Sequence, residues 1–102
     1  MEIRKVLGLS TAHVKEETMR LLEREPETNT LGLTVYGFPY GSWVYTGNLE
    51  EENGGLTCYE SPVQLPEDLT ACILLAVRNG CSWLQFDCDA DPCPELPWYE
   101  WG

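Results

Sequence analysis

The sequence is poor in positive charge. Its 102 residues include six Lys or Arg against 17 Asp or Glu, which leaves a formal net charge of −11. DNA, RNA and anionic membranes all bind basic surfaces, so this composition argues against direct binding to any of them. It favours a partner that is itself basic, such as a protein that handles nucleic acid, although an acidic composition also serves plain solubility.

Long apolar runs are missing as well. No stretch approaches the roughly 20 apolar residues of a membrane span, and residues 1–17 lack the apolar core of a secretion signal. The cysteines are odd in number, and without an export signal they predict free thiols in a cytoplasmic protein. They are Cys58, Cys72, Cys81, Cys88 and Cys93.

Familiar catalytic motifs are absent too. The sequence has no G-x-S-x-G elbow and no phosphate-binding glycine loop. His13 is the single histidine, and a catalytic interpretation makes it a general base for Ser10, Thr11 or a cysteine. A lone histidine in a first helical turn is more often structural. We therefore expect no enzyme, no catalytic residue and no cofactor, and we rank a small His- and Cys-dependent enzyme last among the alternatives.

The chain does contain a clear succession of strands and helices. Apolar runs predict strands at 3–9, 31–38, 42–46 and 82–87, and the run at 56–60 is either a further strand or an extension of the hairpin. A first helix is predicted between these strands. It begins with a capping hydroxyl of residue 10 or 11 and ends at the Glu-Pro pair 25–26.

The second predicted helix has the stronger pattern. It begins at Pro66, ends at Asn79-Gly80, and carries a core-facing stripe at helical spacing. The stripe consists of Leu69, Cys72, Ile73, Ala76 and Val77. The order β-α-β-β-α-β predicts one α+β domain over residues 1–102, a ferredoxin-like (split βαβ) antiparallel sheet with both helices on one face.

The last strand leads into an acidic segment, FDCDADPCPELPWYEW at 86–101. If pairing continues towards Ala90, the two-residue period turns Asp87 and Asp89 to the open face and buries Cys88 as a small apolar side chain. The spacing of Asp87, Asp89 and Asp91 also resembles the first ligands of a calcium loop. That loop needs Gly where Pro92 stands and Glu where Trp98 stands, and the cysteine spacing suits zinc no better, so we predict no metal site.

These acidic groups are the candidate partner-binding residues. The aspartates have about half the density of a phosphate chain, so they act as a nucleic-acid decoy only if other carboxylates share their surface. The other candidates lie in an acidic loop predicted at 47–55 and in an acidic, aromatic tail at 87–102. The full set is Asp87, Asp89, Asp91, Glu95, Glu50, Glu51, Glu52, Tyr99 and Trp101. Large aromatic residues often anchor interfaces, whereas Trp98 is expected to cap the core.

Three segments resemble a family of small uncharacterised bacterial proteins. They are STAH at 10–13, LPEDLTACILLAVRNGCSWLQFD at 65–87 and LPWYEW at 96–101. Relatives of this kind are carried on plasmids, integrative elements and prophages, often near antirestriction genes. The resemblance thus implies a mobile-element setting rather than a mechanism.

Charge, size and this resemblance together predict a non-enzymatic anti-defence inhibitor of the anti-CRISPR or antirestriction type. It would bind a basic nucleic-acid-handling protein, a CRISPR effector or a restriction enzyme, through an acidic surface that mimics DNA. An accessory protein-interaction module of a mobile-element operon is the first alternative. Neither interpretation involves direct contact with nucleic acid or a membrane.

Overall fold

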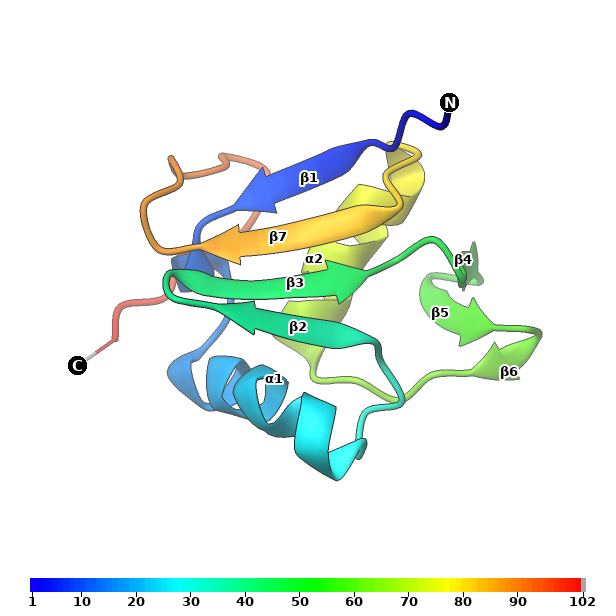
Figure 1. Ribbon diagram of the computed structural model, residues 1–102, viewed down its shortest axis with the longest axis horizontal. Coiled ribbons are helices and arrows are strands. Elements are labelled where there is room, and N and C mark those ends of the chain that lie inside the picture. Colours follow the sequence, from blue (N-terminus) through cyan, green and yellow to red (C-terminus); the bar gives the residue numbers. More distant parts are fainter. Residues whose placement is uncertain (102) are drawn as a thin grey trace.

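The computed structural model describes residues 1–101, so Gly102, the last residue of the predicted tail, lies outside the described part. Two helices and two sheets make up the fold (Figure 1). The strands are β1 (Val6–Leu9), β2 (Val35–Phe38), β3 (Gly41–Tyr45), β4 (Leu49–Glu52), β5 (Gly55–Cys58), β6 (Ser61–Pro62) and β7 (Trp83–Asp87). The helices are α1 (Glu16–Thr28) and α2 (Glu67–Arg78), and a 3₁₀ turn, η1 (Thr11–His13), precedes α1.

The larger sheet has the strand order β1-β7-β3-β2. Strands β2, β3 and β7 pair antiparallel, whereas β1 runs parallel to β7. Val44 in the middle of β3 lies opposite Val35 on one side and Leu84 on the other. This register places branched apolar side chains in a row on one face of the sheet.

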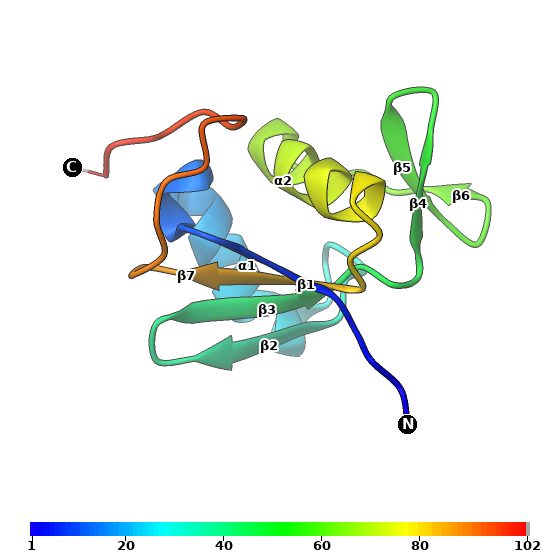
Figure 2. The same cartoon turned by 90° about the horizontal axis from the view of Figure 1, so that it is seen from above.

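Both helices cover that same face. Figure 2 shows α2 on one side of the sheet and the other side free of helices. Phe86 and Leu84 are fully buried in one core with Leu22 of α1 and with Leu69 and Ile73 of α2. Burying each such side chain contributes about 1.5–3 kcal/mol. The prediction of an α+β domain with two helices is therefore correct.

The ferredoxin-like strand order is not what the structure has. That order makes the sheet wholly antiparallel, but here β1 lies at the edge and is parallel to β7. The reason is the insertion of residues 46–66 between β3 and α2. This insertion leads the chain away from β3, and α2 then brings it back to the end of β3. Strand β7 starts there and runs antiparallel to β3. The Thr46 N–H donates to the Ser82 carbonyl at 2.8 Å where the two strands meet.

The insertion folds as a second, three-stranded sheet with the order β4-β5-β6. The prediction of a loop at 47–55 is wrong, because Glu50, Glu51 and Glu52 lie in β4. The turn after β4 explains the difference: Asn53 and Gly54 have φ values of 53° and 81°, and Glu52 pairs with Gly55. An Asn-Gly pair with two positive φ angles is the preferred two-residue hairpin turn.

The first helix also differs from its prediction. Ser10 caps the 3₁₀ turn η1 by accepting the Ala12 N–H, and α1 begins only after Lys15. Pro26 does not end the helix but lies within its last turn, before Asn29 in the left-handed conformation. The second helix matches its prediction, with Pro66 at the start, the apolar stripe facing the core and Gly80 at φ 72° after the end.

The last turn of α1 is fixed by a buried carboxylate. Glu25 is 1% exposed, and its two oxygens accept the backbone N–H groups of Leu31 and Leu33 at 2.9 and 3.0 Å. The Thr30 hydroxyl donates to the same group at 3.4 Å. These bonds satisfy backbone donors of the loop that would otherwise be buried without partners. They hold the entry to β2 in place.

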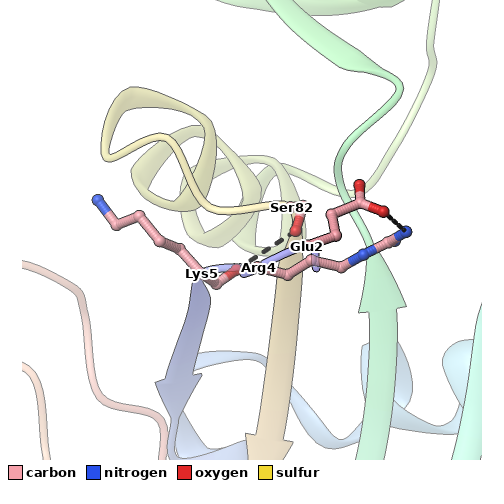
Figure 3. Close-up of polar contacts among 4 residues, drawn as sticks. All are labelled: Glu2, Arg4, Lys5 and Ser82. Atoms are coloured by element: carbon pink, nitrogen blue, oxygen red, sulfur yellow. Dashed lines mark hydrogen bonds and ion pairs between the residues drawn. The ribbon is translucent and has the colours of Figure 1, made fainter.

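The start of β1 is tied to the start of β7 (Figure 3). The Lys5 carbonyl accepts the backbone N–H of Ser82 at 3.0 Å, and the Lys5 ammonium donates to the Asn79 carbonyl at the end of α2. Arg4 and Glu2 form an exposed ion pair at 3.3 Å. Within residues 1–101, neither helix has the length and apolar character needed to cross a bilayer.

We predict that Glu25→Ala lowers the free energy of unfolding by about 2 to 4 kcal/mol, because two buried backbone N–H groups lose their acceptor. Glu25→Gln keeps one acceptor oxygen and is expected to cost less. Urea denaturation followed by circular dichroism measures both. The control is Glu23→Ala on the exposed side of the same helix. Equal destabilisation by Glu25→Ala and the control contradicts the anchoring role.

Candidate functional site

The helix-free side of the larger sheet carries a cluster of aromatic side chains. Alternation along each strand places them opposite the core-facing residues. We call this surface the aromatic face and define it by Tyr36, Phe38, Trp43, Tyr45 and Trp83. Tyr36 is 59% exposed and the others are half-buried. Contiguous apolar exposure of this kind is unusual on a small protein and marks interaction surfaces.

The rings form one connected row. Trp83 lies at the centre, with ring centroids 5.0 Å from Tyr45, 6.1 Å from Tyr36 and 6.2 Å from Trp43. Phe38 extends the row at 6.2 Å from Trp43. Aromatic pairs at these separations stabilise one another by about 0.5–1.5 kcal/mol. The rings are therefore held in place before any partner arrives.

A shallow hollow of about 310 Å³ opens among Tyr36, Trp43 and Trp83. Gln85 lies next to it, because its Cα is paired with that of Trp43 across β3 and β7. Asp87 follows two residues along the same face of β7. An apolar hollow next to a strand that carries an amide and, farther along, a carboxylate offers stacking and nearby polar groups to an extended ligand.

Carboxylates stand at both ends of the aromatic face. At one end β7 terminates in Asp87, which is followed by exposed Asp89. At the other end a hollow of about 440 Å³ brings Tyr45 together with Glu50 and Glu60. The face thus combines an apolar centre with acidic ends, which complements a partner that is apolar or planar in the middle and basic at its flanks.

The predicted acidic residues do not form one surface. Asp87, Asp89 and Asp91 lie at the end of β7, whereas β4 carries Glu50–Glu52 at the opposite end of the molecule (Figure 1). Glu51 is also engaged: both oxygens accept from the Arg78 guanidinium, at 2.9 and 2.6 Å. This hydrogen-bonded pairing lowers the pKa of the Glu51 carboxyl, and the positive charge of Arg78 offsets its negative charge.

The acidic strand end turns earlier than predicted. The Asp87 carboxylate accepts the Asp89 N–H at 2.9 Å, and the Asp87 carbonyl accepts the Ala90 N–H at 3.1 Å. Side-chain bonds of this kind compete with strand pairing. Cys88 is therefore exposed at the turn, and the prediction that it is buried is wrong.

The same turn accounts for a close group of possible metal ligands. Ligand atoms of Asp87, Cys88 and Asp89 lie within 4.8 Å of one another. Desolvation and the adjacent carboxylates of Asp89 and Asp87 raise the pKa of the Cys88 thiol. A raised pKa disfavours the thiolate, which is the nucleophilic form of cysteine. Hydrogen bonding within the turn is sufficient to explain why these groups are close.

The remaining thiols are also free. Cys72 lies on the core stripe of α2, and burial raises the pKa of its thiol to about 12. Its sulfur lies 3.6 Å from the His13 carbonyl, as a weak donor. A buried thiol of this kind packs as a small apolar side chain.

His13 is a structural anchor for the C-terminal tail. It is 1% exposed; Nε2 accepts the Cys93 N–H at 2.8 Å, and Nδ1 lies 2.8 Å from the Pro97 carbonyl. Because Nε2 acts as acceptor, Nδ1 carries the proton and donates it to Pro97. With both nitrogens engaged, neither is available as a general base. A cleft of about 610 Å³ beside His13 runs between the starts of α1 and α2.

The tail aromatics lie along the segment around η1. Tyr99 donates its backbone N–H to the Ala12 carbonyl at 2.8 Å, and the Trp101 indole donates to the Val14 carbonyl at 3.0 Å. Trp98 packs edge-on against the His13 ring at 5.4 Å but remains 50% exposed. Glu95 is exposed on the same tail. Tyr99 and Trp101 thus already have partners within the chain.

Most of the aromatic face was not predicted from the sequence. The two-residue period of the last strand, which turns Asp87 to the open face, also turns Trp83 and Gln85 there, and the same period applies to the hairpin of β2 and β3. The signal was present, because aromatic residues stand at every second position of Tyr36-x-Phe38 and Trp43-x-Tyr45. Two-residue spacing in paired strands puts such residues on one face.

We predict that His13→Ala releases the tail without unfolding the domain. Losing both ring hydrogen bonds is expected to raise the rate of chymotrypsin cleavage after Trp98 and Tyr99 by about tenfold. Mass spectrometry of timed digests measures the cleavage rate, with the exposed-site variant Glu95→Gln as control. Unchanged protection of the tail in His13→Ala contradicts the anchoring role.

A family model for the C-terminal domain of a family of unknown function, DUF5983, matches residues 6–101. No curated protein matches the chain. No solved structure matches it either. The match covers β1 through the tail, including the strands that form the aromatic face. The chain therefore belongs to the DUF5983 family, and it matches the C-terminal domain of that family.

Proposed function

We propose that the protein is a non-enzymatic binding module that inhibits a basic, nucleic-acid-handling protein. The observation that carries this proposal is the aromatic face with a carboxylate group at each end. Trp and Tyr are the side chains most enriched in binding hot spots. They lie here on an ordered sheet, so binding requires little further ordering.

The net charge of −11 supports a basic partner. Complementary charge speeds encounter and selects among partners, although exposed charges are screened within about 8–10 Å at physiological salt. Few positive groups in the molecule would repel a basic partner. Arg4, Arg20 and Arg78 each pair with a carboxylate of the same chain.

The partner class follows from the resemblance described for the sequence. A small acidic protein from a mobile element would act against host defence, with a CRISPR effector or a restriction enzyme as target. In this proposal the aromatic face supplies affinity, while the acidic ends contact the basic groove of the target. Because the acidic groups lie at two ends of the face, each end mimics only a short stretch of phosphates.

The test is a DNA cleavage assay with purified CRISPR effectors and restriction enzymes at 0.05 and roughly 0.15 M salt. The double variant Trp43→Leu/Trp83→Leu is expected to raise the half-inhibitory concentration by about tenfold or more, the size of a lost hot spot. The triple variant Asp87→Asn/Asp89→Asn/Asp91→Asn should weaken inhibition a few-fold, mainly at low salt.

A matched control removes the same amount of charge elsewhere. Glu17, Glu23 and Glu27 are exposed on α1, and their change to Gln is expected to leave inhibition unaltered. Equal loss in this control and in the aspartate variant would mean that only net charge matters. Loss in the aspartate variant with full activity in the tryptophan variant would favour a phosphate decoy. No inhibition of any enzyme by the unaltered protein would contradict the proposed function.

A further inference from the structure

We propose that the corner formed by Tyr36, Trp43 and Trp83 binds an arginine side chain of an extended protein segment. This rests on the proposed function in placing a protein on the aromatic face, and it names the chemical group that is recognised.

The corner has two walls and an open side. The rings of Trp43 and Trp83 stand at 84° with centroids 6.2 Å apart, and Tyr36 is tilted by 37° relative to Trp83 at 6.1 Å. The hollow among the three rings has a volume of about 310 Å³. All three rings line this hollow and none of them is fully buried, so a flat group that enters the hollow can contact aromatic surface.

Aromatic surfaces attract cations through their electron-rich faces, by about 0.5–2 kcal/mol depending on solvation. Within residues 1–101, the Lys15 ammonium lies 5.9 Å from the centroid of the Tyr99 ring and forms a cation–aromatic contact. It lies on the tail side of the molecule. The corner therefore offers its rings to a cation from another molecule.

Hydrogen-bond acceptors follow along β7. Trp83, Gln85 and Asp87 alternate on the same face, with about 6.6 Å between successive members. A guanidinium group stacked at the corner presents five N–H donors in a plane. The amide oxygen of Gln85 is an acceptor next to Trp83 along the strand, whereas the carboxylate of Asp87 lies about 13 Å from Trp83 and would meet a second basic residue of the segment. Asp87 keeps acceptor capacity beyond the one bond its Oδ1 makes to the Asp89 N–H.

The surroundings favour arginine over the other groups that stack on aromatic rings. A nucleic-acid base would bring its phosphates close to Asp87 at one end and to Glu50 and Glu60 at the other. A lysine ammonium is compact and strongly hydrated, so it gains less from a ring surface than a guanidinium does. Basic residues flanking the arginine in an extended segment would meet the acidic ends of the face.

The experiment is a titration of the full chain with two peptides of equal charge, (Gly-Arg)₅ and (Gly-Lys)₅, at roughly 0.15 M salt. Two-dimensional NMR follows the four tryptophan indole N–H signals. The arginine peptide is expected to shift the signals of Trp43 and Trp83 and to leave Trp98 and Trp101 in place. Its affinity should exceed that of the lysine peptide by about fivefold or more, within the range of a cation–aromatic contact.

Substitutions at Trp83 test whether the corner is the binding site of the arginine peptide. Trp83→Phe keeps a smaller aromatic surface and Trp83→Leu removes it, so affinity for the arginine peptide should fall in that order. Trp101→Phe on the tail is the matched control. Circular dichroism verifies that each variant is folded. Because the shifts in the unaltered protein locate the peptide by themselves, the inference does not depend on a variant that fails to fold.

Several outcomes would overturn the inference. They are equal affinity for the two peptides, shifts confined to Trp98 and Trp101, or no binding of the arginine peptide at millimolar concentration. Binding of an oligothymidylate probe at the corner with equal or higher affinity would assign the rings to bases instead. Arginine selectivity without inhibition of any cleavage enzyme would contradict the proposed function alone. Inhibition without arginine selectivity would contradict this inference alone.

Discussion

The packing of both helices against one face of the four-stranded sheet is the constraint on which the rest of the structure depends. Leu84 and Phe86 of β7 are fully buried beneath the helices with Ile73 of α2. A chain of this length can build only one modest core. Within residues 1–101, the other face of the sheet consequently has no helix to cover it (Figure 2). Its aromatic side chains tolerate this position because Trp and Tyr combine an apolar ring with a polar group.

Buried polar groups complete the fold where apolar packing ends. Glu25 holds the loop that leads into β2, and His13 holds the tail after β7. Both side chains satisfy backbone groups that lie outside helices and strands. The sequence makes His13 a candidate general base, but in the structure both of its ring nitrogens form hydrogen bonds to the tail.

The sequence was sufficient to predict the elements that have a strong local signal. The stripe and caps of α2 and the strand at 83–87 follow from spacing, from Pro66 and from Gly80. The strand order could not be predicted from the sequence, because it depends on the path of the insertion at 46–66. Nothing local distinguishes an all-antiparallel sheet from one in which β1 lies parallel to β7 at the edge.

The candidate site was predicted only in part, for a similar reason. Acidic residues stand out in composition, yet composition does not reveal that Asp87 and Glu50 lie at opposite ends of one face. The strand end at Asp87 is set by a side-chain bond to the Asp89 N–H, which overrides simple alternation and exposes Cys88. The alternation of aromatic residues in β2 and β3 is visible in the sequence. That these residues form an uncovered surface follows only once the helices are known to cover the opposite face.

Hydroxyl-radical footprinting of the protein in complex with an enzyme that it inhibits tests the central claim most directly. The account predicts that Tyr36, Trp43 and Trp83 lose most of their reactivity in the complex, while Trp98 and Trp101 keep theirs. Protection of the tail tryptophans with an unprotected sheet face would contradict it.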